Sequence, residues 1–124
     1  HSFPTRRSSD LGIVQKNFGV LGIIAARSNT IYELAKAFVH REIDFELCAQ
    51  PAEEMKKLMA IRGIGSWTAQ YIAMRAMEWT DAFLETDAGI KKALKPCTSK
   101  ELLEMAEAWR PWRSYATVNL WNTL

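Results

Sequence analysis

Apolar residues recur at helical spacing along most of the chain. Between residues 24 and 40 they lie on one face of a predicted amphipathic helix of about four turns. The members of this face are Ile24, Ile31, Leu34, Ala35, Phe38 and Val39. A second helix is predicted to begin at Pro51, with Met55, Leu58 and Met59 on its inner face. Stripes of this kind are typical of helices that pack against a core.

Residues suited to helix starts divide the rest of the chain into further short helices. Pro favours the first turn, Ser, Thr and Asp cap free N–H groups, and "TSKE" at 98–101 is a capping box. The residues with these properties are Pro51, Ser66, Asp87 or Thr86, Thr98 and Pro111. The helices after Pro51 are expected to reach about Met77, Leu94, Arg110 and Leu124. Because no stretch favours a strand and no long period repeats, the predicted fold class is all-α.

The composition is that of a folded protein. The chain has 124 residues, 48% hydrophobic and 24% charged, which suits one ordinary domain. Its apolar stretches are shorter than the roughly 18 residues of a membrane span, so we expect a soluble protein without a membrane partner. Cys48 and Cys97 are far apart and outside any C-x-x-C pattern, which argues against zinc and against an iron–sulfur cluster. Both are interpreted as small buried thiols.

The first residues are set apart from the fold. The sequence "HSFPTRRSSDL", residues 1–11, has no helical or strand periodicity and resembles translated sequencing-adapter DNA. It also lacks the apolar stretch of a signal peptide. We therefore expect the domain to comprise residues 12–124, with a helical hairpin at 52–77.

Positive charge is concentrated around that hairpin. The net charge is only +2, but residues 56–100 contain eight Lys or Arg and four Asp or Glu. Residues 41–54 have the opposite balance, with five acidic residues against Arg41. Such a distribution favours an anionic partner near the hairpin.

The hairpin contains two glycines, Gly63 and Gly65, directly before a predicted helix. Both are predicted to adopt positive φ and to allow another backbone to approach closely. Backbone N–H groups at a helix start form a site for an anion such as a DNA phosphate. The alternative is that the glycines only end one helix and start the next, and the G-x-G pattern alone leaves both interpretations open.

Three segments together resemble a known family. They are "LMAIRGIGSWTAQYIAMRA" (58–76), "DAFLETDAGIKKAL" (81–94) and "AWRPWRSYATVNLW" (108–121). In this order and at these separations they resemble the helix-hairpin-helix DNA glycosylase superfamily (HhH-GPD), and within it the bacterial 3-methyladenine DNA glycosylase II group. The resemblance extends from about Gly19 to the end. It implies an all-α glycosylase domain that lacks its N-terminal part, including the residue that fills the DNA gap after base flipping.

The resemblance also implies an active site. Asp87 matches the catalytic aspartate, and Trp67, Tyr71 and Trp121 match aromatic residues that line the base pocket. Asp87 is also suited to a helix N-cap, and the two roles are compatible. Its neighbours Thr86 and Ala88 differ from the acid and the tyrosine common in close relatives, which suggests a wider pocket.

The resemblance assigns two further sets of backbone atoms at the hairpin. The N–H groups of Gly63, Gly65 and Thr68 match those that hold a DNA phosphate. The carbonyl groups of Met59, Ile61 and Ile64 match those that hold a monovalent metal ion. This structural cation is the one metal expected, and none is expected to take part in catalysis.

Trp67 bears on the mechanism. In superfamily members that also cut the DNA backbone, this position is a lysine that attacks the sugar. Trp67 has no amine, so the site resembles that of a monofunctional glycosylase that uses water as nucleophile. An electron-rich ring face attracts a positively charged alkylated purine by about 0.5–2 kcal/mol.

Other notable residues are given structural roles. Trp79, Trp109 and Trp112 are assigned to the core, and Asp81 and Glu85 are interpreted as solvated loop charges. Lysines near the predicted catalytic aspartate are expected at the surface, where they would add nonspecific attraction to phosphates. These are Lys91, Lys92 and Lys95.

The predicted function is therefore base-excision repair of DNA. The chain is expected to be a monomeric part of a glycosylase that hydrolyses the N-glycosidic bond of 3-methyladenine or 7-methylguanine in double-stranded DNA. The alternative is a noncatalytic helix-hairpin-helix module that grips the DNA backbone, and a weaker one is a purely structural helical domain. Asp87, Trp67 and Trp121 favour the enzyme, because a module that only grips DNA does not need them.

Overall fold

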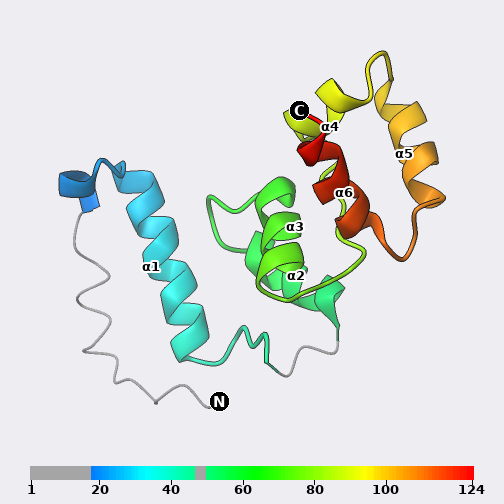
Figure 1. Cartoon of the computed structure of the whole chain (residues 1–124). Helices are drawn as coiled ribbons and strands as arrows, with labels where there is room; N and C mark the ends of the chain where they lie inside the picture. Colours follow the sequence, from blue (N-terminus) through cyan, green and yellow to red (C-terminus); the bar gives the residue numbers. More distant parts are fainter. Residues whose placement is uncertain (1–17, 47–49) are drawn as a thin grey trace. The chain divides into compact units, whose positions relative to one another are not determined.

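The computed structural model describes residues 18–46 and 50–124 (Figure 1). Every regular element in these two ranges is a helix, which confirms the predicted all-α fold. The predicted non-native segment 1–11 and Cys48 lie outside the described residues. The described residues divide into two compact units, with the boundary between Ile64 and Gly65, and each is described by itself. Within the described ranges, none of the helices has both the length and the apolar character of a membrane-spanning segment.

The first unit contains the short 3-10 helix η2 (Phe18–Leu21) and the α-helices α1 (Ala25–Val39) and α2 (Pro51–Met59). These bounds confirm the two helices predicted from the apolar pattern. Leu58 is fully buried, whereas Met59 is 48% exposed, so the predicted inner face is wrong at that residue. Successive helical residues point about 100° apart, and the narrow buried face of α2 includes Leu58 but not its neighbour.

The second unit contains the helices α3 (Ser66–Arg75), α4 (Ala88–Ala93), α5 (Ser99–Glu107) and α6 (Arg113–Asn122), with α4 packed against α6 (Figure 1). Its buried side chains come from all four helices and from the loop between α3 and α4. They include Ala69, Ala73, Met74, Phe83, Leu84, Ile90, Leu102, Ala106 and Thr117. This core fixes the elements that carry the candidate site.

Two predicted helix caps are confirmed in the second unit. The Asp87 carboxylate accepts the N–H of Ile90 at 3.0 Å and caps α4. The Thr98 hydroxyl accepts the N–H of Glu101 at 3.1 Å and caps α5. In both cases a local side chain satisfies an N–H group that the helix itself leaves unpaired.

Two other predicted helix starts are wrong. The N-cap of α3 is Gly65, which has extended backbone angles, and Ser66 is already the first helical residue. The last helix begins at Arg113 rather than Pro111, because tertiary contacts set its start. There the N–H of Ser114 donates to the carbonyl of Thr80 at 2.8 Å.

The loop between α3 and α4 is held from both sides. The side-chain oxygen of Gln70, on α3, accepts the N–H of Phe83 at 3.1 Å. The hydroxyl of Ser114, on α6, accepts the N–H of Ala82 at 2.9 Å. These bonds fix the loop and therefore the position of Asp87 at the start of α4.

Asp81 reinforces this loop and corrects a prediction. It is 8% exposed and pairs with Arg113 and with Arg110, each at 2.8 Å, so its interpretation as a solvated loop charge is wrong. Burial acts to raise the pKa of Asp81, but the hydrogen bond and charge of Arg113, with the charge of Arg110, outweigh it and leave this pKa below its ordinary value. Glu85, in contrast, is exposed as predicted.

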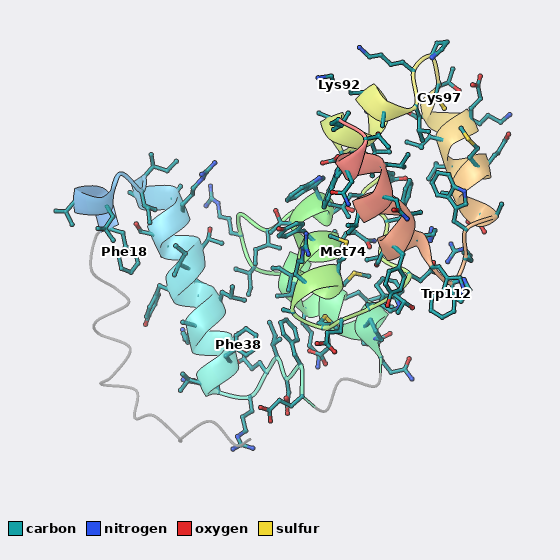
Figure 2. The ribbon with its side chains drawn as sticks, viewed as in Figure 1. Phe18, Phe38, Met74, Lys92, Cys97 and Trp112 are labelled. Atoms are coloured by element: carbon teal, nitrogen blue, oxygen red, sulfur yellow. The ribbon has the colours of Figure 1, made fainter. Side chains whose placement is uncertain are left out.

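The tryptophans assigned to the core differ from one another. Trp79 and Trp109 are half-buried, and the ring of Trp109 packs edge-on against Phe83 with centroids 6.2 Å apart. Trp112 is 57% exposed, so its assignment to the core is wrong. It lies at the joint before α6, where its ring contacts Tyr115 (Figure 2).

Candidate active site

The second unit brings together four residues that the sequence assigned to one site. Asp87 stands at the start of α4, Trp67 and Tyr71 lie on α3, and Trp121 lies near the end of α6. These elements are separated by loops along the chain, so their meeting is a result of tertiary packing. Trp67, Tyr71, Asp87 and Trp121 are linked by direct contacts, and we call this group the aspartate–indole cluster.

Both tryptophans donate hydrogen bonds to the aspartate. The indole Nε1–H of Trp67 donates to Oδ1 of Asp87 at 3.0 Å, and that of Trp121 donates to Oδ2 at 2.7 Å. Oδ2 also accepts the N–H of Ile90, as the cap of α4. Each carboxylate oxygen is thus held by a donor from a different helix.

Tyr71 connects the two indoles. Its ring is stacked on that of Trp67, with centroids 5.1 Å apart and planes within 9°. It is also 6.3 Å from Trp121 in a tilted arrangement. The guanidinium of Arg75 lies 5.7 Å from the Tyr71 ring centre. Residues 67, 71 and 75 follow at four-residue steps, which places their side chains along one face of α3.

The aspartate is ionised at neutral pH. Burial of Asp87 acts to raise its pKa. The hydrogen bonds from Trp121, from the N–H of Ile90, from Trp67 and from the N–H of Gly89 together outweigh burial and lower this pKa below its ordinary value. The cluster therefore presents a negative charge next to exposed aromatic surface, since Trp67 is 38% exposed.

Gly89 makes the approach of Trp121 to Asp87 possible. A Cβ at this position would lie 3.0 Å from Oδ2 of Asp87 and 3.0 Å from Cδ1 of Trp121. Both atoms belong to groups already fixed by their mutual hydrogen bond, so neither moves away without loosening it. A glycine in a short helix costs stability, and here close packing explains its presence.

The two hairpin glycines differ in conformation. Gly63, in the first unit, has φ +100°, as predicted, and a Cβ there would collide with the hydroxyl of Thr30 on α1. That hydroxyl donates to the carbonyl of Arg62 at 2.8 Å and so ties the hairpin to α1. The sequence contained no signal for this contact.

Gly65, in the second unit, has φ −96°, so the predicted positive φ is wrong there. A Cβ at Gly65 would meet no atom within 4 Å. As the N-cap of α3 it has no side chain to pair with the first N–H groups of the helix, which include that of Thr68. The start of α3 therefore has no side-chain cap and has open space at its N-cap residue.

The carbonyl groups assigned to a monovalent ion all belong to the first unit. Those of Met59, Ile61 and Ile64 are peptide oxygens, which suit a hard cation such as Na⁺ or K⁺. The carbonyl of Ile61 accepts the N–H of Ile64 at 3.1 Å and retains one lone pair. The donor set fits such an ion, and its presence stays a prediction.

Comparison with known proteins identifies the family. No protein-family profile matches the chain. A protein from Mycobacterium tuberculosis (strain H37Rv), named probable bifunctional transcriptional activator/DNA repair enzyme AlkA, is 34% identical over 128 residues, covering 100% of this chain and 25% of that protein. DNA-3-methyladenine glycosylase 2 of Escherichia coli (strain K12) is 35% identical over 103 residues, covering 83% of this chain and 36% of the relative. The chain belongs to the helix-hairpin-helix DNA glycosylase superfamily.

A third relative supports the assignment to this superfamily. DNA-3-methyladenine glycosylase of Bacillus subtilis (strain 168) is 41% identical over 76 residues, which cover 56% of this chain and 25% of the relative. This chain thus spans between 25% and 36% of the length of these three relatives.

Sequence reasoning identified the members of the aspartate–indole cluster but not their bonds. The indole donors lie 20 and 34 residues from Asp87, and no local pattern relates such positions. Gly89 was detectable in principle, because a glycine in the first turn of a helix needs a packing reason. Gln70, which holds the loop between α3 and α4 through the N–H of Phe83, has no such signal.

Proposed function

We propose that this chain belongs to a repair enzyme that hydrolyses the N-glycosidic bond of alkylated purines in double-stranded DNA. The observation that carries the proposal is an ionised Asp87 held between two indole donors, beside the exposed ring of Trp67, which stacks on the half-buried Tyr71. The superfamily assignment supports the same reaction, and relatives are named for 3-methyladenine.

In the proposed reaction the bond between C1′ of the sugar and the purine nitrogen breaks, and its electron pair leaves with the base. An alkylated purine carries a positive charge, so this departure neutralises the base and makes the sugar cationic. The carboxylate of Asp87 stabilises that developing charge. The oxygen of a water molecule then bonds to C1′ and releases a proton to solvent, which completes a hydrolysis.

The absence of an amine at Trp67 favours this monofunctional route. A lysine there would form a Schiff base with the sugar, whereas an indole can only stack or donate its N–H. Trp67 and Arg75 both lie against the ring of Tyr71, so less of that ring is available to a base. We therefore assign the main stacking contact with the flipped base to the exposed ring of Trp67. A cationic base gains about 0.5–2 kcal/mol from such a ring face.

The start of α3 and the hairpin are proposed to hold the DNA backbone. The N–H groups of Gly65 and Thr68 would donate to a phosphate, helped by the dipole of α3, and the N–H of Gly63 is proposed to bind the DNA backbone as well. Such contacts position the protein without reading base sequence. The carbonyls of Met59, Ile61 and Ile64, all in the first unit, are proposed to bind a monovalent cation with a structural role.

The decisive experiment measures release of free bases. Duplex DNA methylated with dimethyl sulfate is incubated with the chain, and with a hybrid in which the chain replaces the 103 aligned residues of the E. coli relative. We expect release of 3-methyladenine or 7-methylguanine. Asp87→Asn, which keeps the size of the side chain, should lower the single-turnover rate by roughly a hundredfold or more while lesion binding persists.

Two outcomes would contradict this proposal. Binding of duplex without base release by either protein would favour the noncatalytic helix-hairpin-helix module. Capture of a covalent protein–DNA adduct by borohydride would show an amine nucleophile and refute the monofunctional mechanism.

A further inference from the structure

The aspartate–indole cluster contains more donors than a helix cap requires. Capping of α4 needs one carboxylate oxygen, and Oδ2 of Asp87 fulfils this by accepting the N–H of Ile90. The bond from Trp67 to Oδ1 contributes nothing to the cap, and the 2.7 Å bond from Trp121 is an additional one on Oδ2. These two bonds therefore call for another explanation.

Both indoles are oriented by their surroundings. The parallel stack on Tyr71 sets the ring plane of Trp67, and thereby the direction of its N–H. Trp121 is on α6, whose first turn is tied to the loop by Asp81 and Arg113. The missing side chain of Gly89 leaves the space in which Trp121 meets the carboxylate. The donors are thus fixed before any ligand binds.

The chemical character of the donors matters. Two arginines on the same elements are engaged elsewhere, since Arg75 lies over Tyr71 and Arg113 binds Asp81. The other charged side chains near Asp87 are exposed; these are Lys91 and Lys92 on α4 and Glu85 before it. The side-chain hydrogen bonds to Asp87 come from neutral indoles. A lysine or arginine partner would cancel the negative charge, whereas a neutral N–H stabilises the anion and leaves its charge available to a cation.

We propose that Trp67 and Trp121 are positioning residues that act through their indole N–H groups, holding the Asp87 carboxylate ionised and in one orientation. This role is separate from stacking against a base, which uses the ring faces. Its consequence for catalysis rests on the proposed function, since Asp87 must act on the sugar for its orientation to affect the rate. The hydrogen bonds themselves do not depend on any activity.

The test uses ¹H–¹⁵N NMR spectra of the chain, whose five tryptophans give five indole signals. Between pH 2 and 7 the signals of Trp67 and Trp121 should move with one shared midpoint below 3.8, the ordinary aspartate pKa. Asp87→Asn, which removes no ring, should abolish this movement in both signals. If neither signal titrates, or if both still titrate in Asp87→Asn, the proposal is wrong.

A second measurement separates the N–H from the ring. Trp121→Phe keeps an aromatic side chain but removes the donor, so the midpoint of the Asp87 carboxyl ¹³C signal should rise by about one pH unit. Trp109→Phe, whose ring packs on Phe83, is the matched control and should leave that midpoint unchanged. An unchanged midpoint in a folded Trp121→Phe protein would overturn the proposal.

The same variants distinguish this proposal from the proposed function. In active protein, Trp121→Phe should move the acidic limb of the pH–rate profile to higher pH, in parallel with the carboxyl midpoint. If the NMR midpoint rises but the limb does not move, the indoles still position Asp87, and its catalytic assignment is the part that fails.

Discussion

At the scale of single residues, two glycines of one motif have different physical reasons to be glycine. Gly63 needs its φ of +100° and would collide with Thr30 if it had a side chain. Gly65 has an ordinary φ and empty space around it. Neither a positive φ nor a close contact therefore requires a glycine here, and the proposed phosphate site at the start of α3 would be served by its missing side chain.

This difference predicts that the same substitution affects DNA binding at Gly65 and folding stability at Gly63. Gly65→Ala should change the free energy of unfolding by less than about 1 kcal/mol, because alanine fits the backbone angles. Its methyl group should lower affinity for undamaged duplex at least about tenfold by blocking a phosphate. Gly63→Ala should instead destabilise the protein. Fluorescence anisotropy and urea unfolding measure both effects, and unchanged affinity in Gly65→Ala would remove the phosphate site from the start of α3.

At the scale of elements, the loop between α3 and α4 determines where Asp87 stands. Its backbone is bound by the side chains of Gln70 and Ser114, and Asp81 is bound by two arginines. Apolar periodicity predicts where helices lie, but it carries no information about a loop that is ordered by polar contacts from distant segments. Asp81 was misassigned for this reason.

Removing the charge of Asp81 should show how much this loop depends on it. Asp81→Asn leaves the guanidinium of Arg113 half-paired in a site where both side chains are only 11% exposed. The expected loss is about 3 kcal/mol in the free energy of unfolding. Glu107→Gln is the control, because it removes an exposed partner of Arg110 and should have little effect. Equal unfolding midpoints in urea for the two variants would show that Asp81 does not fix the loop.

At the scale of the whole molecule, two aspartates of the second unit, Asp81 and Asp87, have lowered pKa values. For Asp81 and Asp87 burial acts to raise the pKa, but hydrogen bonds, and in Asp81 the arginine charges, outweigh it. A group whose pKa is lower in the folded state stabilises that state fully above its unfolded pKa. The contribution is lost as the pH falls through the lower, folded value.

The stability of the second unit should therefore decrease in acid. The free energy of unfolding should be nearly constant from about pH 7 to 5. It should decrease when the pH falls below 3.8, the ordinary pKa of aspartate. Thermal unfolding at each pH, followed by near-ultraviolet circular dichroism of the tryptophans, would measure this loss of stability. The double variant Asp81→Asn, Asp87→Asn should have a flatter profile, and an equally steep loss in that variant would assign the acid sensitivity to other groups.

The sequence by itself determined the helical class, the approximate bounds of the helices and the caps at Asp87 and Thr98, while the family resemblance supplied the members of the candidate site. Helical periodicity and capping depend on residues within a few positions of one another, so they can be recognised locally. The bonds from Trp67 and Trp121 to Asp87, the burial of Asp81 and the ordinary φ of Gly65 were decided by the tertiary structure alone. Each depends on atoms brought together by packing of distant segments, and the energy of those contacts is absent from any local pattern.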